Sequence, residues 1–176
     1  MPFSIPYIRQ GVAHQGAPGL RCRLGAIIIA ASFLLASSVH AMDAEVLIGK
    51  LPRAYLGEFA WNGDKTVQNV TMVLESVKAL NNQNVEAIGC GAYEVNRKVT
   101  KIRVRMLVRL PDLRVEILEQ SPVGNASFET DGSHRGNLSE DLQQIDAQWT
   151  TRSSGQQGQL HLRSAPSAVC APAASL

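Results

Sequence analysis

Residues 101–118 read KIRVRMLVRLPDLRVEIL, and this stretch decides the fold of the chain. The apolar residues up to Leu110 alternate with Lys101, Arg103, Arg105, Leu107 and Arg109, and a second alternating run starts at Leu113. A two-residue period is the period of a β-strand, and Pro111-Asp112 is a turn signal. With the turn placed there, Val108 faces Val115 and Met106 faces Ile117. The pattern therefore predicts an antiparallel hairpin with one apolar face.

The same period recurs along most of the chain after Tyr55. Asn62-Gly63 and Asp131-Gly132 are hairpin turn signals, the latter between expected strands at 126–130 and 133–138. We count about eight short strands within about 110 residues, and no helix between them is long enough for a crossover. This predicts an all-β antiparallel meander. A closed up-and-down barrel removes the exposed edges, and a two-sheet sandwich is the alternative.

The first strand carries a short aromatic motif, Gly57-Glu58-Phe59-Ala60-Trp61, and Trp149 precedes the final strand. With the eight-strand meander, this order resembles calycin-type barrels, which include the avidins and lipocalins. The resemblance implies a barrel whose open end often holds a small ligand. Core packing near the barrel ends is the default expectation for Trp61 and Trp149. The alternative is that they line a ligand mouth, and a ligand-binding barrel would use Tyr55, Trp61 and Trp149 there.

The N-terminal segment has the layout of a secretory signal peptide. Arg21 and Arg23 precede an apolar run over 24–36, and small residues end at Ala41. We predict a signal peptide with a long leader over 1–41, a single β-barrel domain over 42–163 and an Ala/Pro/Ser-rich tail over 164–176. An uncleaved anchor is the alternative. Export would place the protein in the bacterial periplasm or outside the cell.

The cysteine count fits that compartment. Cys22 lies within the predicted signal, which leaves Cys90 and Cys170 in the exported chain. Two cysteines in an exported protein most simply form one disulfide, which here would tie the tail to the body. The alternative is two separate thiols.

Charge is informative only in its distribution. The chain has 17 basic and 15 acidic residues, and removal of 1–41 takes three basic residues and no acidic one, leaving 14 and 15. Such a balance argues against nucleic acid as a partner. Seven basic residues nevertheless gather between 97 and 114. They form either a solvated outer face or an anion-binding face for polysaccharide, lipid head groups or an acidic protein, made by Lys101, Arg103, Arg105 and Arg109.

No catalytic or metal-binding motif is recognisable. A metal site is not expected, because His134 and His161 have no ligand partner at metal-binding spacing. Asp131 and Ser133 beside His134 are better explained as part of a turn than as a catalytic cluster. Glycoside chemistry by paired carboxylates is not expected, because Glu116 and Glu119 fall on opposite faces of a strand. We expect no enzyme activity, no cofactor, no metal, and contact with a membrane only through the signal segment. The predicted function is an exported, non-catalytic barrel that binds a small or extended ligand. The alternative is a protein- or polyanion-binding module acting through residues 97–114; oligomeric state stays open.

Overall fold

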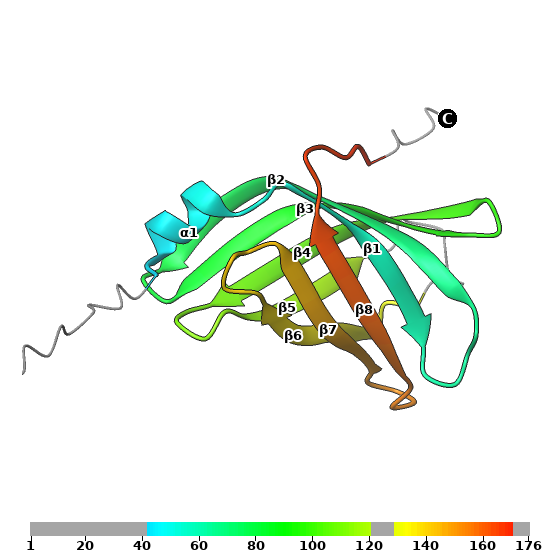
Figure 1. The fold of residues 1–176 in the computed structure, drawn as a ribbon. Coiled ribbons are helices and arrows are strands. Elements are labelled where there is room, and N and C mark those ends of the chain that lie inside the picture. Colours follow the sequence, from blue (N-terminus) through cyan, green and yellow to red (C-terminus); the bar gives the residue numbers. More distant parts are fainter. Residues whose placement is uncertain (1–41, 121–128, 171–176) are drawn as a thin grey trace, which may run out of the picture. The chain divides into compact units, whose positions relative to one another are not determined.

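The computed structural model describes residues 42–120 and 129–170, so the predicted signal peptide over 1–41 lies outside the described part. Within these residues, eight strands follow one short helix, and consecutive strands pair antiparallel. β8 pairs with β1 and closes the barrel (Figure 1). The all-β barrel is thus confirmed and the sandwich is excluded. The strands are β1 (Ala54–Trp61), β2 (Val67–Asn81), β3 (Asn84–Val95), β4 (Lys98–Arg109), β5 (Arg114–Gln120), β6 (Gly132–Leu138), β7 (Gln144–Thr151) and β8 (Gln157–Ser164).

The central hairpin has the predicted register. Val108 pairs with Val115, and Met106 pairs with Ile117. All four side chains are buried in the barrel, whereas Arg103 and Arg105, at the alternate positions of β4, are exposed. Because a slip of one residue would place these arginines inside, burial of the apolar face holds the register.

The hairpin predicted at Asp131-Gly132 is wrong. Gly132 already belongs to β6 and pairs with Thr151, residues 129–130 are in no strand, and 126–128 lie outside the described residues. The Asp131 carbonyl oxygen accepts a hydrogen bond from Arg152 N at 2.7 Å, and its carboxylate accepts one from Ser153 N at 3.1 Å. Asp131 therefore holds the turn between β7 and β8, and β6 takes β5 as its other partner.

The helix α1 (Ala44–Lys50) was not predicted. Asp43 caps its first turn by accepting a hydrogen bond from Val46 N at 2.8 Å, and Leu47 is fully buried in the barrel core. The helix packs against β2 and β3, near the turn that joins them (Figure 1). In the described part of the chain, no helix has the length and apolar content needed to cross a bilayer.

The barrel has two different ends. One end carries α1 and the β2–β3, β4–β5 and β6–β7 connections, and it is filled by buried leucines from these segments, namely Leu47, Leu51, Leu110, Leu113, Leu138 and Leu142. We call the other end the mouth. It carries the β1–β2, β3–β4 and β7–β8 turns.

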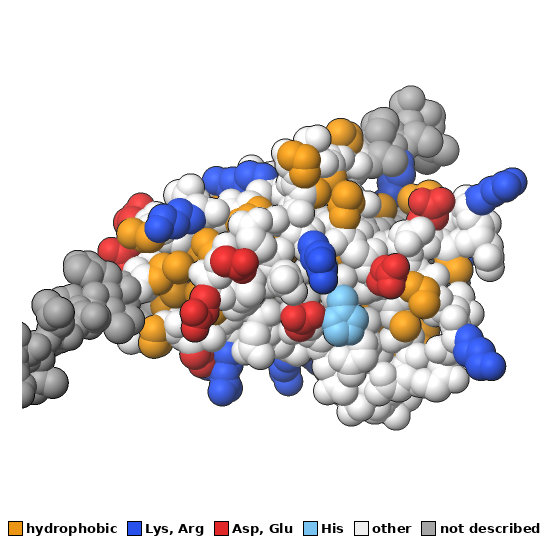
Figure 2. All heavy atoms as spheres, viewed as in Figure 1, with side chains coloured by type: hydrophobic (Ala, Val, Ile, Leu, Met, Phe, Trp, Pro, Cys, Tyr) orange, Lys and Arg blue, Asp and Glu red, His pale blue; other side chains and the backbone are white. Residues whose placement is uncertain are grey.

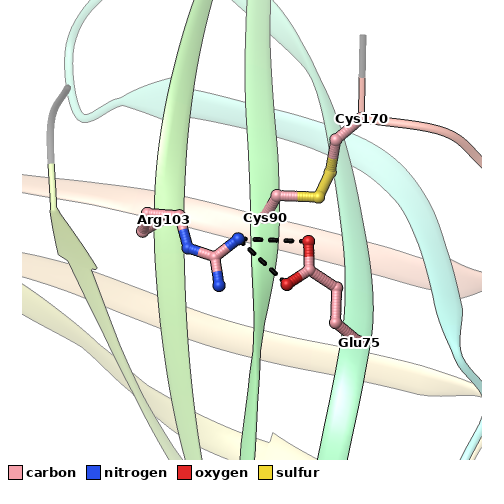
Figure 3. Close-up of a disulfide and its surroundings, with 4 residues drawn as sticks. All are labelled: Glu75, Cys90, Arg103 and Cys170. Atoms are coloured by element: carbon pink, nitrogen blue, oxygen red, sulfur yellow. Dashed lines mark hydrogen bonds and ion pairs between the residues drawn. A yellow bond between two sulfur atoms is a disulfide. The ribbon is translucent and has the colours of Figure 1, made fainter. Parts of the chain in front are cut away.

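The predicted disulfide is present between Cys90 and Cys170. Their Cα atoms are 6.0 Å apart, and 80 positions separate them in the sequence. Cys90 lies on β3, and Figure 3 shows the bridge beside an ion pair between Arg103 and Glu75. The segment after β8 is thereby fastened to a strand on another part of the wall. A disulfide is consistent with an oxidising, exported location.

Removing this bridge should destabilise the barrel. We expect the Cys90→Ser/Cys170→Ser variant to lose about 2–5 kcal/mol of unfolding free energy, because the cross-link restricts a long loop in the unfolded chain. Urea unfolding of the oxidised protein, the reduced protein and the variant measures the loss. The variant should match the reduced protein, and equal midpoints for the oxidised and reduced forms would contradict the expectation.

Candidate functional site

A cavity of about 220 Å³ lies at the mouth of the barrel. Four of its lining residues are aromatic and come from three strands: Phe59 and Trp61 from β1, Tyr93 from β3 and Trp149 from β7. Gln68, Glu119, Glu129 and His134 supply its polar lining. The strand residues among them lie close to the mouth end of their strands, so barrel closure brings together side chains that are far apart in the sequence.

Phe59 is the centre of the aromatic packing. Its ring is edge-on to Trp61, Tyr93 and His134, with centroid distances of 5.0, 5.8 and 5.7 Å. Edge-to-face contacts of this kind are favourable because the positive ring edge meets a negative ring face. Gly158 makes room for the ring, since a Cβ there would overlap the Phe59 ring atoms.

Three polar side chains at the same site share hydrogen bonds. The Tyr93 hydroxyl donates to Glu119 Oε1 at 2.5 Å, and His134 Nε2 lies 2.9 Å from the same oxygen. Tyr93 Oη and His134 Nε2 are 3.2 Å apart. Glu119 is 8% exposed and His134 is 1% exposed, so the cluster is shielded from bulk water. Because hydrogen bonds are strong in a buried environment, they hold all three side chains in fixed orientations.

Burial and the Glu119 carboxylate both act on Tyr93. Burial disfavours the phenolate, and the neighbouring negative charge and its hydrogen bond add to this, so the pKa of Tyr93 is raised well above its usual value. Tyr93 therefore keeps its proton and serves as a hydrogen-bond donor.

Two buried nitrogen atoms at this site have no hydrogen-bond partner among the described residues. They are His134 Nδ1 and Trp149 Nε1, and the two rings are neighbours with centroids 4.8 Å apart. Since Glu119 Oε1 accepts in this cluster, His134 Nε2 carries the donated proton, and in that neutral tautomer Nδ1 is an acceptor. The indole N–H is a donor. The site thus contains two unpartnered, buried nitrogens on neighbouring rings.

The structure brings together two of the three predicted mouth residues. Trp61 and Trp149 both line the cavity. Tyr55 does not, because it lies at the opposite end of β1, where it is fully buried and donates a hydrogen bond to the Leu142 carbonyl oxygen at 3.0 Å. At about 3.3 Å per residue, the length of the strand keeps it far from Trp61. Its place is in the core of the closed end, and burial raises its pKa.

Sequence reasoning missed Glu119 and His134. It correctly placed Glu116 and Glu119 on opposite faces, since Glu116 is bonded to Arg135 at 2.8 Å while Glu119 is inside. The signal was available: Glu119 follows Val115 and Ile117 at the same two-residue spacing, so it shares their buried face.

The predicted anion-binding face lies on the outside of β4. Arg103 is paired with Glu75 at 2.9 Å, Arg105 with Glu86 at 2.7 Å and Arg109 with Asp112 at 3.8 Å. Lys101, the fourth predicted residue, lies half-buried on the same strand. Acidic partners therefore offset most of this positive charge. In Figure 2, acidic and basic side chains are likewise interspersed on the face in view.

Glu86 shows how strong this local compensation is. Its side chain is only 5% exposed, and it lies between Lys78 at 3.0 Å and Arg105 at 2.7 Å. Hydrogen bonds from these two cations lower the pKa of Glu86. The carboxylate stays charged and keeps both basic groups engaged.

No model of a known protein family matches the chain, and a comparison with curated proteins finds no similar sequence. Within the described residues, no group of three or more His, Cys, Asp or Glu side chains is placed to hold a metal ion. The chemistry of the mouth is therefore the basis for a functional assignment.

The two buried tyrosines should make the fold sensitive to alkali. Because their pKa values are raised in the folded state, their stabilising effect is complete below pH 10 and is lost as the pH rises above it. In a titration followed by phenolate absorbance and circular dichroism, we expect Tyr55 and Tyr93 to ionise only together with unfolding. Tyr55→Phe and Tyr93→Phe variants identify the two contributions; phenolates forming in a fully folded barrel would contradict this.

Proposed function

We propose that the protein is an exported, non-catalytic β-barrel that binds a small ligand in the cavity at its mouth. The observation that carries the proposal is the pair of buried, unpartnered nitrogens, Trp149 Nε1 and His134 Nδ1, in two residues of the cavity wall. A buried polar group without a partner costs about 1–3 kcal/mol, and a ligand with one acceptor and one donor recovers that free energy.

The cavity volume limits the ligand. About 220 Å³ equals the liquid volume of about seven water molecules and is below the range of about 300–1,000 Å³ for drug-sized ligands. Phe59, Trp61 and Trp149 offer apolar contact around the polar pair. A small molecule, or the end of a larger one, fits this space.

A binding role explains the Tyr93–Glu119–His134 cluster better than catalysis does. The hydrogen bonds of the three side chains run to one another and orient the His134 ring with Nδ1 away from the cluster. The pKa of Tyr93 is raised, which favours a fixed donor over a group that exchanges its proton during a reaction. The cluster thus supports a ligand-binding surface.

The proposed compartment is the bacterial periplasm or the extracellular space. The layout of residues 1–41 and the Cys90–Cys170 disulfide support it. Secretion into the medium and retention in the periplasm are told apart by fractionating cells that express the full chain.

The test of ligand binding uses the two tryptophans. The chain has two, so its NMR spectrum should contain two indole N–H resonances, and a Trp61→Phe variant assigns them. We expect ligands found in a screen of small cationic, neutral and anionic compounds to shift the Trp149 resonance. The Trp149→Phe variant should bind them about five- to tenfold more weakly, because one hydrogen bond is lost.

The control variant is Tyr55→Phe, which removes a buried hydroxyl at the far end of the barrel and should leave the affinity unchanged. A screen at millimolar concentration that moves neither indole resonance would contradict the proposal.

A groove on the outer wall supports a second candidate function, polyanion binding. It has a volume of about 530 Å³ and is lined by Arg109, Arg114 and Arg135, with Asn84 and Asn137 as amide donors. Asp112 is within 3.0 Å of Arg114, and Glu116 is within 2.8 Å of Arg135, so an anionic polymer has to compete with these carboxylates. Fixed forks of guanidinium groups suit sulfate and carboxylate groups.

This candidate predicts salt-dependent binding to a sulfated polysaccharide. The Arg114→Ala/Arg135→Ala variant should bind several-fold more weakly and with a smaller salt dependence. The Arg53→Ala/Arg163→Ala variant changes the net charge equally at exposed positions outside the groove and should bind as the parent does. Equal losses in the two variants would show that only net charge matters and would exclude the groove.

A further inference from the structure

We propose that the cavity at the mouth takes a small organic cation with a hydroxyl group, of the amino-alcohol class to which choline belongs. The inference rests on the proposed function, because it names the ligand class of the same cavity. Charge, aromatic lining and the unpartnered nitrogens each specify one part of such a molecule.

The charge of the lining favours a cation. Among the described residues, the cavity is lined by two carboxylates, Glu119 and Glu129, and by no Lys or Arg. Glu119 is engaged with Tyr93 and His134, whereas Glu129 is exposed, and one of its oxygens accepts a hydrogen bond from Asp131 N at 2.7 Å. Glu129 thus gives the mouth a carboxylate in the same cavity lining as the aromatic rings.

The aromatic lining supplies a complementary surface. Phe59, Trp61, Tyr93 and Trp149 line one small space, and Trp61 is only half-buried while the other three rings are buried. The negative face of an aromatic ring attracts an ammonium group, most strongly when the ring is Trp. Several aromatic rings with a nearby carboxylate form a suitable binding site for a quaternary or primary ammonium group.

The hydroxyl of the ligand follows from the polar pair. An alcohol oxygen can accept from the Trp149 indole N–H and donate to His134 Nδ1 at the same time. The centroids of the two rings are 4.8 Å apart, and we assign both contacts to one hydroxyl group. A carboxylate could accept from Trp149, but it could not donate to Nδ1 and it would face the Glu119 and Glu129 charges.

Three ligands of nearly the same shape separate these contributions. Choline carries the positive charge and the hydroxyl, 3,3-dimethylbutan-1-ol keeps the hydroxyl without the charge, and ethyltrimethylammonium keeps the charge without the hydroxyl. Titrations followed by the Trp149 indole resonance give each affinity. We expect choline to bind about five- to thirtyfold more tightly than the neutral alcohol and about fivefold more tightly than the cation without a hydroxyl.

Two variants with the same change of charge test whether the Glu129 carboxylate attracts the cation. Glu129→Gln removes the carboxylate charge at the mouth and retains an oxygen that can accept from Asp131 N. It should weaken choline severalfold and leave the neutral alcohol unchanged. Glu140→Gln makes the same chemical change at an exposed position in the β6–β7 connection at the other end of the barrel, so it should alter neither affinity.

The outcomes separate this inference from the proposed function. If the neutral alcohol, or its carboxylate analogue 3,3-dimethylbutanoate, binds as tightly as choline, the preference for a positively charged ligand is contradicted. Ligand binding at the mouth then still stands. If choline fails to shift the indole resonance but other screened compounds shift it, the amino-alcohol class is overturned alone. If no compound shifts either indole resonance, the proposed function falls as well.

Discussion

The pairing of β8 with β1 is the constraint on which the rest of the structure depends. Gly57 pairs with Leu162 in the middle of this seam, and a Cβ at Gly57 would overlap the His161 backbone, so the two strands meet closely. Closure gives every strand an inside and an outside. It thereby converts the two-residue alternation of the sequence into a core and a solvated wall.

Closure also explains why the polar groups at the mouth are costly. In an open sheet Glu119 and His134 would reach water, but in the barrel they are almost fully buried and have to satisfy each other. Tyr93 on β3 completes the arrangement. The mouth end thus carries the desolvation cost of a fixed set of buried, hydrogen-bonded polar groups, whereas the other end is filled by leucines and α1.

The fold was largely predictable because its signals are local and repeated. The alternation around Met106 and Ile117 was enough to set strands and register, and two cysteines in an exported chain were enough to suggest their pairing. Helix α1 escaped prediction because seven residues are too few to show a helical period. The hairpin turn predicted at Asp131-Gly132 was wrong because the dipeptide does not reveal that Asp131 accepts hydrogen bonds from the β7–β8 turn.

The site was less predictable because it depends on which strand ends meet. Trp61 and Trp149 could be named from residue type alone, and both line the cavity. Tyr55 shares their type and the inward face of β1, but it lies at the other end of the strand, and alternation carries no information about depth along the barrel. Glu119 and His134 come from strands joined through residues 121–131, so their contact follows from strand pairing and barrel closure.

The Cys90–Cys170 bridge has a topological consequence. The covalent ring that it closes runs from β3 through β4, β5, β6, β7 and β8, so most of the wall lies inside one loop of chain. A single cut in any connection of that loop, such as the β7–β8 turn, leaves both pieces covalently attached. A protease that nicks an exposed turn between these strands therefore cannot release a strand from the barrel, and the nicked molecule keeps the same mass until it is reduced, apart from the water added at the cut.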